Sequence, residues 1–189
     1  VVYDAGNGTM AARLWWMLRW VGHENVAVLD GGYLKWVSEG REVTRAVPEY
    51  QPTGYDGVCA AANVDAAYVA SHLGANDTLL LDARAPARFR GESEPIDPVA
   101  GRIPGARNRF CGDNLGADGL FKRAEDLRKE FGALLGDRTP QEVVHYCGSG
   151  VAACHNALSM EIAGFPGSRL YAGSWSEWIS DPRRPQEKG

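Results

Sequence analysis

The sequence has no apolar run long enough to cross a bilayer: stretches such as residues 79–81 are far shorter than the ~20 residues that a membrane-spanning helix needs. It also has no basic stripe, because its 20 Lys and Arg residues are scattered among 24 Asp and Glu residues, for a formal net charge of -4. No signal peptide is visible. We therefore expect neither a nucleic-acid partner nor a membrane partner.

Cysteine is scarce and irregularly placed. The four cysteines include no pair at C-x-x-C spacing and no Cys/His cluster of the kind that binds zinc, which argues against a metal site. A chain of 189 residues, 44% of them hydrophobic, can bury enough apolar surface to fold without disulfides. We therefore expect a reducing, cytoplasmic compartment, with at least one cysteine kept for chemistry.

An internal repeat is the most informative feature of the chain. Residues 1–36 and 143–178 share one order: a short apolar run typical of a buried strand, a glycine-rich loop, a helix, a glycine, a second apolar run and a tryptophan. The glycines that follow the two helices, Gly22 and Gly164, are 142 residues apart and suit left-handed helix caps. Strand–loop–helix–strand, twice over, predicts an α/β fold with a parallel β-sheet flanked by helices.

The second repeat has a long upstream part that the first repeat lacks. Its patterns predict helices over 64–73 and 125–135, a strand over 78–82 and an ordered loop over 86–105. The two repeat helices are predicted over 11–21 and 153–163.

Domain boundaries follow from this unevenness. We predict that residues 1–47 are the C-terminal part of a first domain, that 48–62 are a linker rich in turn formers, and that 63–189 are a complete second domain. The first domain is thus present only in part. The chain begins at Val1 without a methionine, and we expect the front half of the first domain to lie upstream.

Cys147 stands where a predicted strand passes into a helix through the small residues Gly-Ser-Gly-Val-Ala at 148–152. Such a loop can turn successive backbone N–H groups inward as an anion nest, and the helix behind it points its positive end at the same place. Both features favour the reactive thiolate and would cradle an outer, anionic sulfur. A buried structural cysteine is the plainer alternative. The first repeat has Asp4 at this position, which predicts one active and one scaffold copy.

Five stretches, in order, make the chain similar to the tandem-domain rhodanese family, which includes thiosulfate and 3-mercaptopyruvate sulfurtransferases. Any one of them alone would be weak, but together they extend over essentially the whole chain. They are the Cys147 loop, Leu81-Asp82-Ala83-Arg84, Arg88-Phe89-Arg90-Gly91, Gly101-Arg102-Ile103-Pro104-Gly105-Ala106 and Gly173-Ser174-Trp175-Ser176-Glu177-Trp178.

This resemblance implies a fold, a set of roles and a reaction. The fold is a five-stranded parallel sheet flanked by helices, in tandem, with 63–189 as the catalytic rhodanese domain and 1–47 as part of a non-catalytic one. Cys147 is the nucleophile that forms a persulfide, Ser149 assists proton transfer, and Arg88 holds an anionic donor. The backbone cradle is formed by the amides of Gly148, Gly150, Val151, Ala152 and Ala153.

Three further interpretations stay open at this stage. Arg88 is read as a donor-binding cation, although a surface ion pair is the plainer alternative. Arg84 is equally well read as a substrate-binding residue or as a structural partner of Asp82. Trp175 is read as a packing residue that could also line the mouth of the pocket.

The sequence departs from the family pattern at three places. A second arginine is lacking in the segment 94–98, Ala152 replaces a threonine, and Arg102 replaces the histidine of the Ile-Pro-Gly signature. The neutral Gly148 and Ser149 resemble the mercaptopyruvate branch, whereas the missing arginine argues the other way. On balance the sequence slightly favours 3-mercaptopyruvate over thiosulfate as the donor.

The mechanism implied is a two-step transfer in which Cys147 takes sulfur from a small-molecule donor and gives it to cyanide, a thiol or a thioredoxin-like protein. It needs no metal or organic cofactor. A cysteine phosphatase is a rival, but its loop would end in an arginine that clamps phosphate, and this loop has Ala152, Ala153 and Cys154 there. A non-catalytic rhodanese-like binding or scaffold module is the other alternative.

Overall fold

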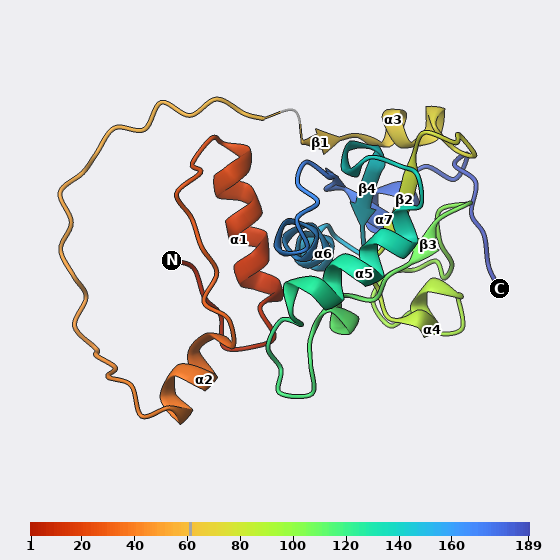
Figure 1. Cartoon of the computed structure of the whole chain (residues 1–189). Coiled ribbons are helices and arrows are strands. Elements are labelled where there is room, and N and C mark those ends of the chain that lie inside the picture. Colours follow the sequence, from red (N-terminus) through yellow and green to blue (C-terminus); the bar gives the residue numbers. More distant parts are fainter. Residues whose placement is uncertain (61) are drawn as a thin grey trace.

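The computed structural model describes residues 1–60 and 62–189 (Figure 1). Its strands are β1 (Asn63–Val64), β2 (Leu79–Asp82), β3 (Arg107–Asn108), β4 (Val143–Tyr146) and β5 (Arg169–Tyr171). Its α-helices are α1 (Thr9–Trp20), α2 (Gly32–Ser38), α3 (Ala66–Ser71), α4 (Pro86–Phe89), α5 (Ala124–Leu135), α6 (Val151–Ile162) and α7 (Ser174–Trp178). Two 3-10 helices, η1 (Cys111–Asn114) and η2 (Pro140–Glu142), complete the order.

The five strands form one parallel sheet in the order β1-β5-β4-β2-β3, which confirms the predicted α/β class. In the register of the sheet Asp82, the last residue of β2, lies between Tyr146 of β4 and Asn108 of β3. The carboxyl ends of these three strands therefore meet at one edge. In open α/β sheets that edge is where ligands bind.

Both faces of the sheet are covered, because successive side chains of a strand point to opposite sides. Leu79 and Leu81 of β2 pack under α5 and α6, together with residues such as Phe131. Leu80, between them, packs on the opposite face against α3 and α7, where Trp178 is fully buried. This burial on both faces explains why the strands read as continuous apolar runs rather than alternating ones.

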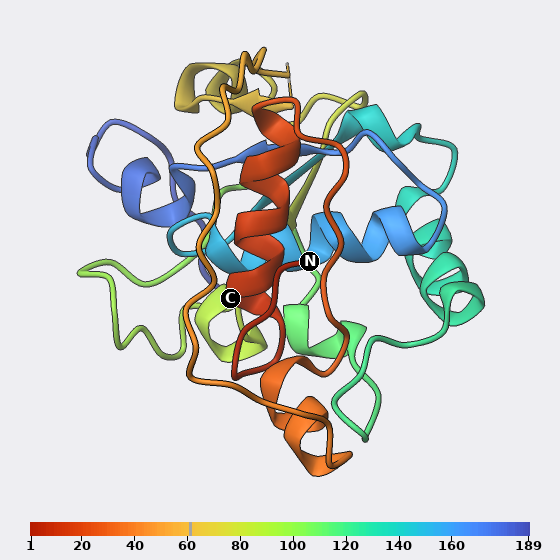
Figure 2. The same ribbon diagram turned by 90° about the vertical axis from the view of Figure 1, so that its left-hand side faces the viewer.

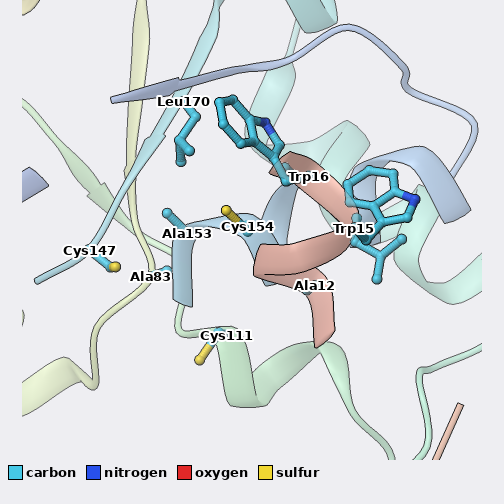
Figure 3. Close-up of a cluster of buried hydrophobic side chains, with 11 residues drawn as sticks. Ala12, Trp15, Trp16, Ala83, Cys111, Cys147, Ala153, Cys154 and Leu170 are labelled. Atoms are coloured by element: carbon cyan, nitrogen blue, oxygen red, sulfur yellow. The ribbon is translucent and has the colours of Figure 1, made fainter. Parts of the chain in front are cut away.

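The first repeat contributes α1, which lies across α6 on the outer side of the second repeat (Figures 1 and 2). Trp15 and Trp16 of α1 bury their rings against the helix that contains Cys154 (Figure 3). A single parallel bridge, between Val2 and Val28, marks the two apolar runs of this repeat. The predicted repeat helices are thus confirmed, each beginning two residues earlier than the sequence indicated.

The predicted linker, 48–62, contains no helix or strand over residues 48–60, and Ala61 lies outside the described residues. The segment after α2, residues 39–60, passes on the outer side of α1 (Figures 1 and 2). It contacts the end of that helix where Tyr55 donates a hydrogen bond to the carbonyl of Val21. No helix among the described residues is long and apolar enough to cross a membrane.

The loop predicted over 86–105 is wrong in one respect, because its first residues form the short helix α4. Pro86 stands in the first turn, where its fixed φ suits a helix and its missing N–H costs nothing. This single turn places Arg88 beside the carboxyl edge of the sheet.

Candidate active site

Cys147 follows β4 directly and lies at the carboxyl edge of the sheet. β4 ends at Tyr146 and α6 begins at Val151, so the Gly-Ser-Gly turn at 148–150 joins the strand to the helix. Cys147 is a free thiol with an exposed fraction of only 3%. A nucleophile in this place is held rigidly and reached through a cavity rather than from the open surface.

Gly150 makes the turn possible. It caps α6 with a left-handed φ of 76°, a conformation that side chains with a Cβ rarely adopt. A Cβ built on Gly150 would lie 2.3 Å from the carbonyl oxygen of Ala172. Both the dihedral angle and the close backbone approach therefore require glycine.

The segment that begins α7 fixes the turn by hydrogen bonds to its backbone. The N–H of Cys147 donates to Oγ of Ser174 at 3.1 Å, and the N–H of Trp175 donates to the carbonyl of Cys147 at 3.0 Å. The N–H and the hydroxyl of Ser176 both donate to the carbonyl of Gly148. Ser174 adopts a φ of 55° to make these contacts, which is strained for a residue other than glycine. This strain is concentrated where the loop must be held.

The first repeat contains the corresponding loop, which is one residue longer and is occupied by its own carboxylate. Oδ1 of Asp4 accepts hydrogen bonds from the N–H groups of Gly6 and Gly8, at 2.9 and 3.1 Å. Oδ2 accepts from the N–H groups of Met10 and Ala11, both at 3.0 Å. Burial opposes ionisation of Asp4, but these four backbone donors outweigh it and lower the pKa of the carboxyl group. The loop of the first repeat is therefore an anion nest.

Asp4 and Cys147 are equivalent positions in the two repeats. The N–H of Tyr33 donates to the carbonyl of Asp4 at 2.9 Å, just as the N–H of Trp175, 142 residues later, donates to the carbonyl of Cys147. The helices that follow begin at Thr9 and Val151, which are also 142 residues apart. The nest at Asp4 is therefore a precedent for the loop after Cys147, which is one residue shorter and leads into its helix in the same way.

A cavity of about 350 Å³ opens over this loop. Most of the residues predicted for the site line it, whereas Gly150, Ala153 and Trp175 do not, because they are buried. Sequence reasoning did not single out the walls supplied by Thr9 and Phe110. The lining residues are Thr9, Ala83, Arg84, Ala85, Arg88, Ile96, Phe110, Cys111, Cys147, Gly148, Ser149, Val151, Ala152 and Ser176.

Comparison with known families agrees with this geometry. The chain matches the Rhodanese-like domain family over residues 1–39 and 65–181. It belongs to the rhodanese family. The family resemblance predicted from the five sequence motifs is therefore confirmed.

Named relatives of this rhodanese include sulfurtransferases. A Pseudomonas aeruginosa protein named "Probable 3-mercaptopyruvate sulfurtransferase" is 52% identical over 191 residues, covering 100% of this chain and 67% of its own length. The Homo sapiens 3-mercaptopyruvate sulfurtransferase is 36% identical, covering 97% of this chain and 63% of its own length. The Cricetulus griseus thiosulfate sulfurtransferase is 35% identical, covering 95% of this chain and 62% of its own length.

Solved structures show the same fold. The anaerobic ergothioneine biosynthesis enzyme from Chlorobium limicola, in complex with trimethyl histidine, superposes with a TM-score of 0.83 at 27% identity. The alignment covers 95% of this chain and 45% of that one. A structure of EanB with ergothioneine and a cysteine persulfide matches equally well, at 26% identity. The rhodanese chain described here thus spans about two thirds of its curated relatives and less than half of these solved chains.

Arg84 is buried beside the Cys147 site, where it binds two carboxylates. Its guanidinium bonds both carboxylate oxygens of Asp82, with Nη2 at 2.7 Å from Oδ2, and reaches Glu94 at 3.2 Å. It also lies over the ring of Trp175, 5.0 Å from the centroid. Arg84 lines the cavity, but its hydrogen-bonding groups are engaged within the protein. The ring of Trp175 therefore supports the site through Arg84 rather than as part of the cavity wall.

Two further thiols lie near Cys147. β2 lies between β4 and β3, so Cys147 and Cys111 follow strands on either side of Ala83 (Figure 3). Burial raises the pKa of Cys111 to about 11 and that of Cys154 to about 12. Both thiols are thus protonated at neutral pH. Cys154 belongs to the core, as the sequence indicated, whereas nothing in the sequence marked Cys111 as part of the cavity wall.

The replacements at 102 and 152 have different surroundings. Arg102 lies outside the cavity, where it pairs with Glu187 and donates to the carbonyl of Gly189, tying the C-terminal segment to the Ile-Pro-Gly loop. Ala152 lines the cavity and presents a methyl group there. Only the second replacement changes the chemistry of the wall.

A buried polar network behind α6 has no clear sequence signal. Oδ1 of Asn114 accepts two hydrogen bonds from Arg109, so its amide nitrogen must face Nδ1 of His155. His155 then carries its proton on Nε2 and donates it to the carbonyl of Asn7 in the first repeat, at 3.2 Å. Burial lowers the pKa of His155 to about 4, so the ring is neutral. It holds the two repeats together and does not reach the cavity.

Among residues 1–60 and 62–189, no group of three or more His, Cys, Asp or Glu side chains is placed to bind a metal ion.

Proposed function

We propose that this rhodanese is a sulfurtransferase, which takes sulfur from a small anionic donor onto Cys147 and passes it to a thiol or to cyanide. One observation carries the proposal: Cys147 occupies the position at which the equivalent loop directs four amide groups onto the carboxylate of Asp4. A persulfide anion on Cys147 needs the same stabilisation. The names of the relatives from Pseudomonas aeruginosa and Homo sapiens support this activity.

In the first step the thiolate of Cys147 attacks the outer sulfur of thiosulfate or the thiol sulfur of 3-mercaptopyruvate. The bond that held this sulfur breaks, and sulfite or the enolate of pyruvate leaves with the electron pair. The enolate then takes up a proton to become pyruvate. Ser149 lines the cavity beside Cys147, and we propose that it delivers that proton.

In the second step an acceptor nucleophile attacks the outer sulfur of the persulfide. The sulfur–sulfur bond breaks, and its electron pair returns to Cys147 as the thiolate. Cyanide would leave as thiocyanate, and a thiol would leave as a new persulfide. A cellular thiol or a thioredoxin-like protein in a reducing, cytoplasmic compartment fits this chemistry, and no metal or organic cofactor is required.

The test is the mass of the intact full-length protein after incubation with 3-mercaptopyruvate or, separately, with thiosulfate. We expect a gain of one sulfur atom that is lost on later exposure to cyanide. Cys147→Ser removes the nucleophile and should abolish the gain. Cys111→Ser is the matched control, because it removes a second thiol of the same cavity whose pKa of about 11 keeps it protonated.

Two outcomes would decide against the proposal. If folded wild-type protein gains no sulfur from either donor, a non-catalytic rhodanese-like binding module becomes the better account. If the gain survives in Cys147→Ser, sulfur is carried elsewhere and the assignment of the nucleophile is wrong.

A further inference from the structure

Arg88, the cation expected to receive the donor, is already engaged by two carboxylates. Nε and Nη2 of its guanidinium contact Oε1 of Glu94 at 3.0 and 2.6 Å. Nη2 also lies 3.3 Å from Oδ2 of Asp97. The edge of the guanidinium that could bind an oxyanion with two parallel hydrogen bonds is thus occupied by the protein itself.

The Nη1–Nη2 end of the Arg88 guanidinium faces the turn that follows Cys147. A Cβ built on Gly148 would lie 3.4 Å from Nη2 and 3.6 Å from Nη1 of Arg88, so the guanidinium abuts the residue next to Cys147. Among the described residues, no hydrogen-bond acceptor is assigned to Nη1. A sulfur donor can therefore bind Arg88 through Nη1 alone, because Nε and Nη2 already bind carboxylates of the protein.

Asp97 is connected to the same turn through a hydroxyl group. Ser176 donates from Oγ to Oδ1 of Asp97 at 2.7 Å and shares its hydroxyl with the carbonyl of Gly148 at 2.8 Å. The Asp97 side chain is only 7% exposed. Its carboxylate therefore stays beside the cavity and acts on any charge that enters there.

In the ion pairs at this edge of the sheet, three carboxylate side chains face two guanidinium groups. Arg84 and Arg88 face the carboxylates of Asp82, Glu94 and Asp97. Burial opposes ionisation of Glu94, but the bonds from Arg88 and from two backbone N–H groups outweigh it and lower the pKa of Glu94. A donor with two negative charges is thus repelled more strongly than a donor with one.

We propose that Asp97 is a specificity-determining residue, which disfavours doubly charged sulfur donors such as thiosulfate and favours singly charged thiol-bearing 2-oxo carboxylates. This inference rests on the proposed sulfurtransferase function and names the class of donor at the same site. Asp97 is the better test position than Glu94, because Glu94 also binds Arg84 and two backbone N–H groups of its own loop.

The experiment measures kcat/KM for thiosulfate and for 3-mercaptopyruvate with full-length protein at low and moderate salt. Asp97→Asn removes the charge and keeps an oxygen for Ser176. We expect kcat/KM for thiosulfate to rise about tenfold, and that for 3-mercaptopyruvate to change by less than about threefold, because only one unit of repulsion distinguishes the donors. The difference should shrink as salt increases.

Glu92→Gln is the matched control. Glu92 is an acid of the same loop, but it pairs with Arg90 at the exposed surface and does not line the cavity. Its donor preference should equal that of the wild type.

A second variant adds a charge without touching the buried pairs. Ile96 lines the cavity, yet it is 74% exposed, so Ile96→Lys is expected to fold even if Asp97→Asn does not. It should also raise the ratio of thiosulfate to 3-mercaptopyruvate activity.

The inference is overturned if both donors change by the same factor in the two charge variants, or if neither donor changes. A wild-type protein that accepts sulfur from neither donor contradicts the proposed function instead, so the two failures are distinguishable.

Discussion

Arg13 of the first repeat donates a hydrogen bond from Nη1 to the carbonyl oxygen of Gly150 in the turn that follows Cys147, at 3.3 Å. The same nitrogen lies 3.7 Å from the sulfur of Cys154. His155, 142 residues after Arg13, makes the reciprocal contact with the carbonyl of Asn7 in the loop of the first repeat. Each repeat thus uses one helix position to hold the loop of the other. The part of the first repeat that contains α1 therefore supports the loop that follows Cys147.

Replacing Arg13 by Ala should destabilise the turn that follows Cys147. The hydrogen bond from a charged donor is worth about 1.5–3 kcal/mol when its acceptor is partly buried, so we expect sulfur loading of Cys147 to slow by about tenfold or more. The measurement is the single-turnover rate of persulfide formation, set beside the thermal midpoint of the same sample. Arg19→Ala is the control, since Arg19 lies on the same helix over Trp15 and away from the turn. Equal rates in the two variants would contradict a role for Arg13.

Gly150→Ala should disrupt the turn more severely. The left-handed φ of 76° costs a residue with a Cβ roughly 1–2 kcal/mol, and the new Cβ would also meet the carbonyl of Ala172 at 2.3 Å. Gly119 has the same φ but nothing within 4 Å of its Cβ position. Gly119→Ala is therefore the control, because it has the conformational cost of the left-handed φ without the clash. Urea unfolding should therefore show a larger loss of stability for Gly150→Ala. Equal losses would mean that the backbone approach at Ala172 does not constrain the turn.

Acid should destabilise the protein through its buried histidines. The pKa of His155 is about 4 in the folded protein and 6.5 when unfolded, so the unfolded chain binds an extra proton between these values. The stability that neutral His155 contributes is present above pH 6.5 and is lost as the pH falls toward 4. For this one group the loss is about 2 kcal/mol between pH 7 and pH 5. Burial lowers the pKa of His145 to about 3, so this residue acts in the same direction.

The measurement is the free energy of unfolding in urea at several pH values. His155→Gln removes one titrating group, and its stability should fall by about 2 kcal/mol less than that of the wild type between pH 7 and pH 5. The same slope in both proteins would show that His155 is not the residue responsible.

The sequence was sufficient to predict the structural features that depend on repeated patterns along the chain. The order of apolar runs, glycines and helices indicated the parallel sheet and placed Cys147 at a strand end, because these features depend on local periodicity and on backbone conformation. The carboxylates around Arg88 were not predicted, since Glu94 and Asp97 lie in a loop without periodicity. Cys111 likewise reaches the cavity only because β3 ends beside β2. Such pairings are set by tertiary packing rather than by spacing along the chain.

Asp4→Asn should test whether the nest of the first repeat stabilises negative charge. The amide keeps one oxygen for the N–H groups of Gly6 and Gly8, but its NH2 group would face the N–H groups of Met10 and Ala11, which then lose their acceptor. We expect the free energy of unfolding to fall by about 2 kcal/mol. The control is Asp118→Asn, because that exposed carboxylate accepts one local hydrogen bond, from Leu120. The rate of sulfur loading at Cys147 should change much less than the stability, because Asp4 supports the fold and not the reacting atoms. If Asp4→Asn is as stable as the wild type, the four amide groups do not favour an anion over a neutral group. The electrostatic argument for a persulfide anion at Cys147, the equivalent position, would then be wrong.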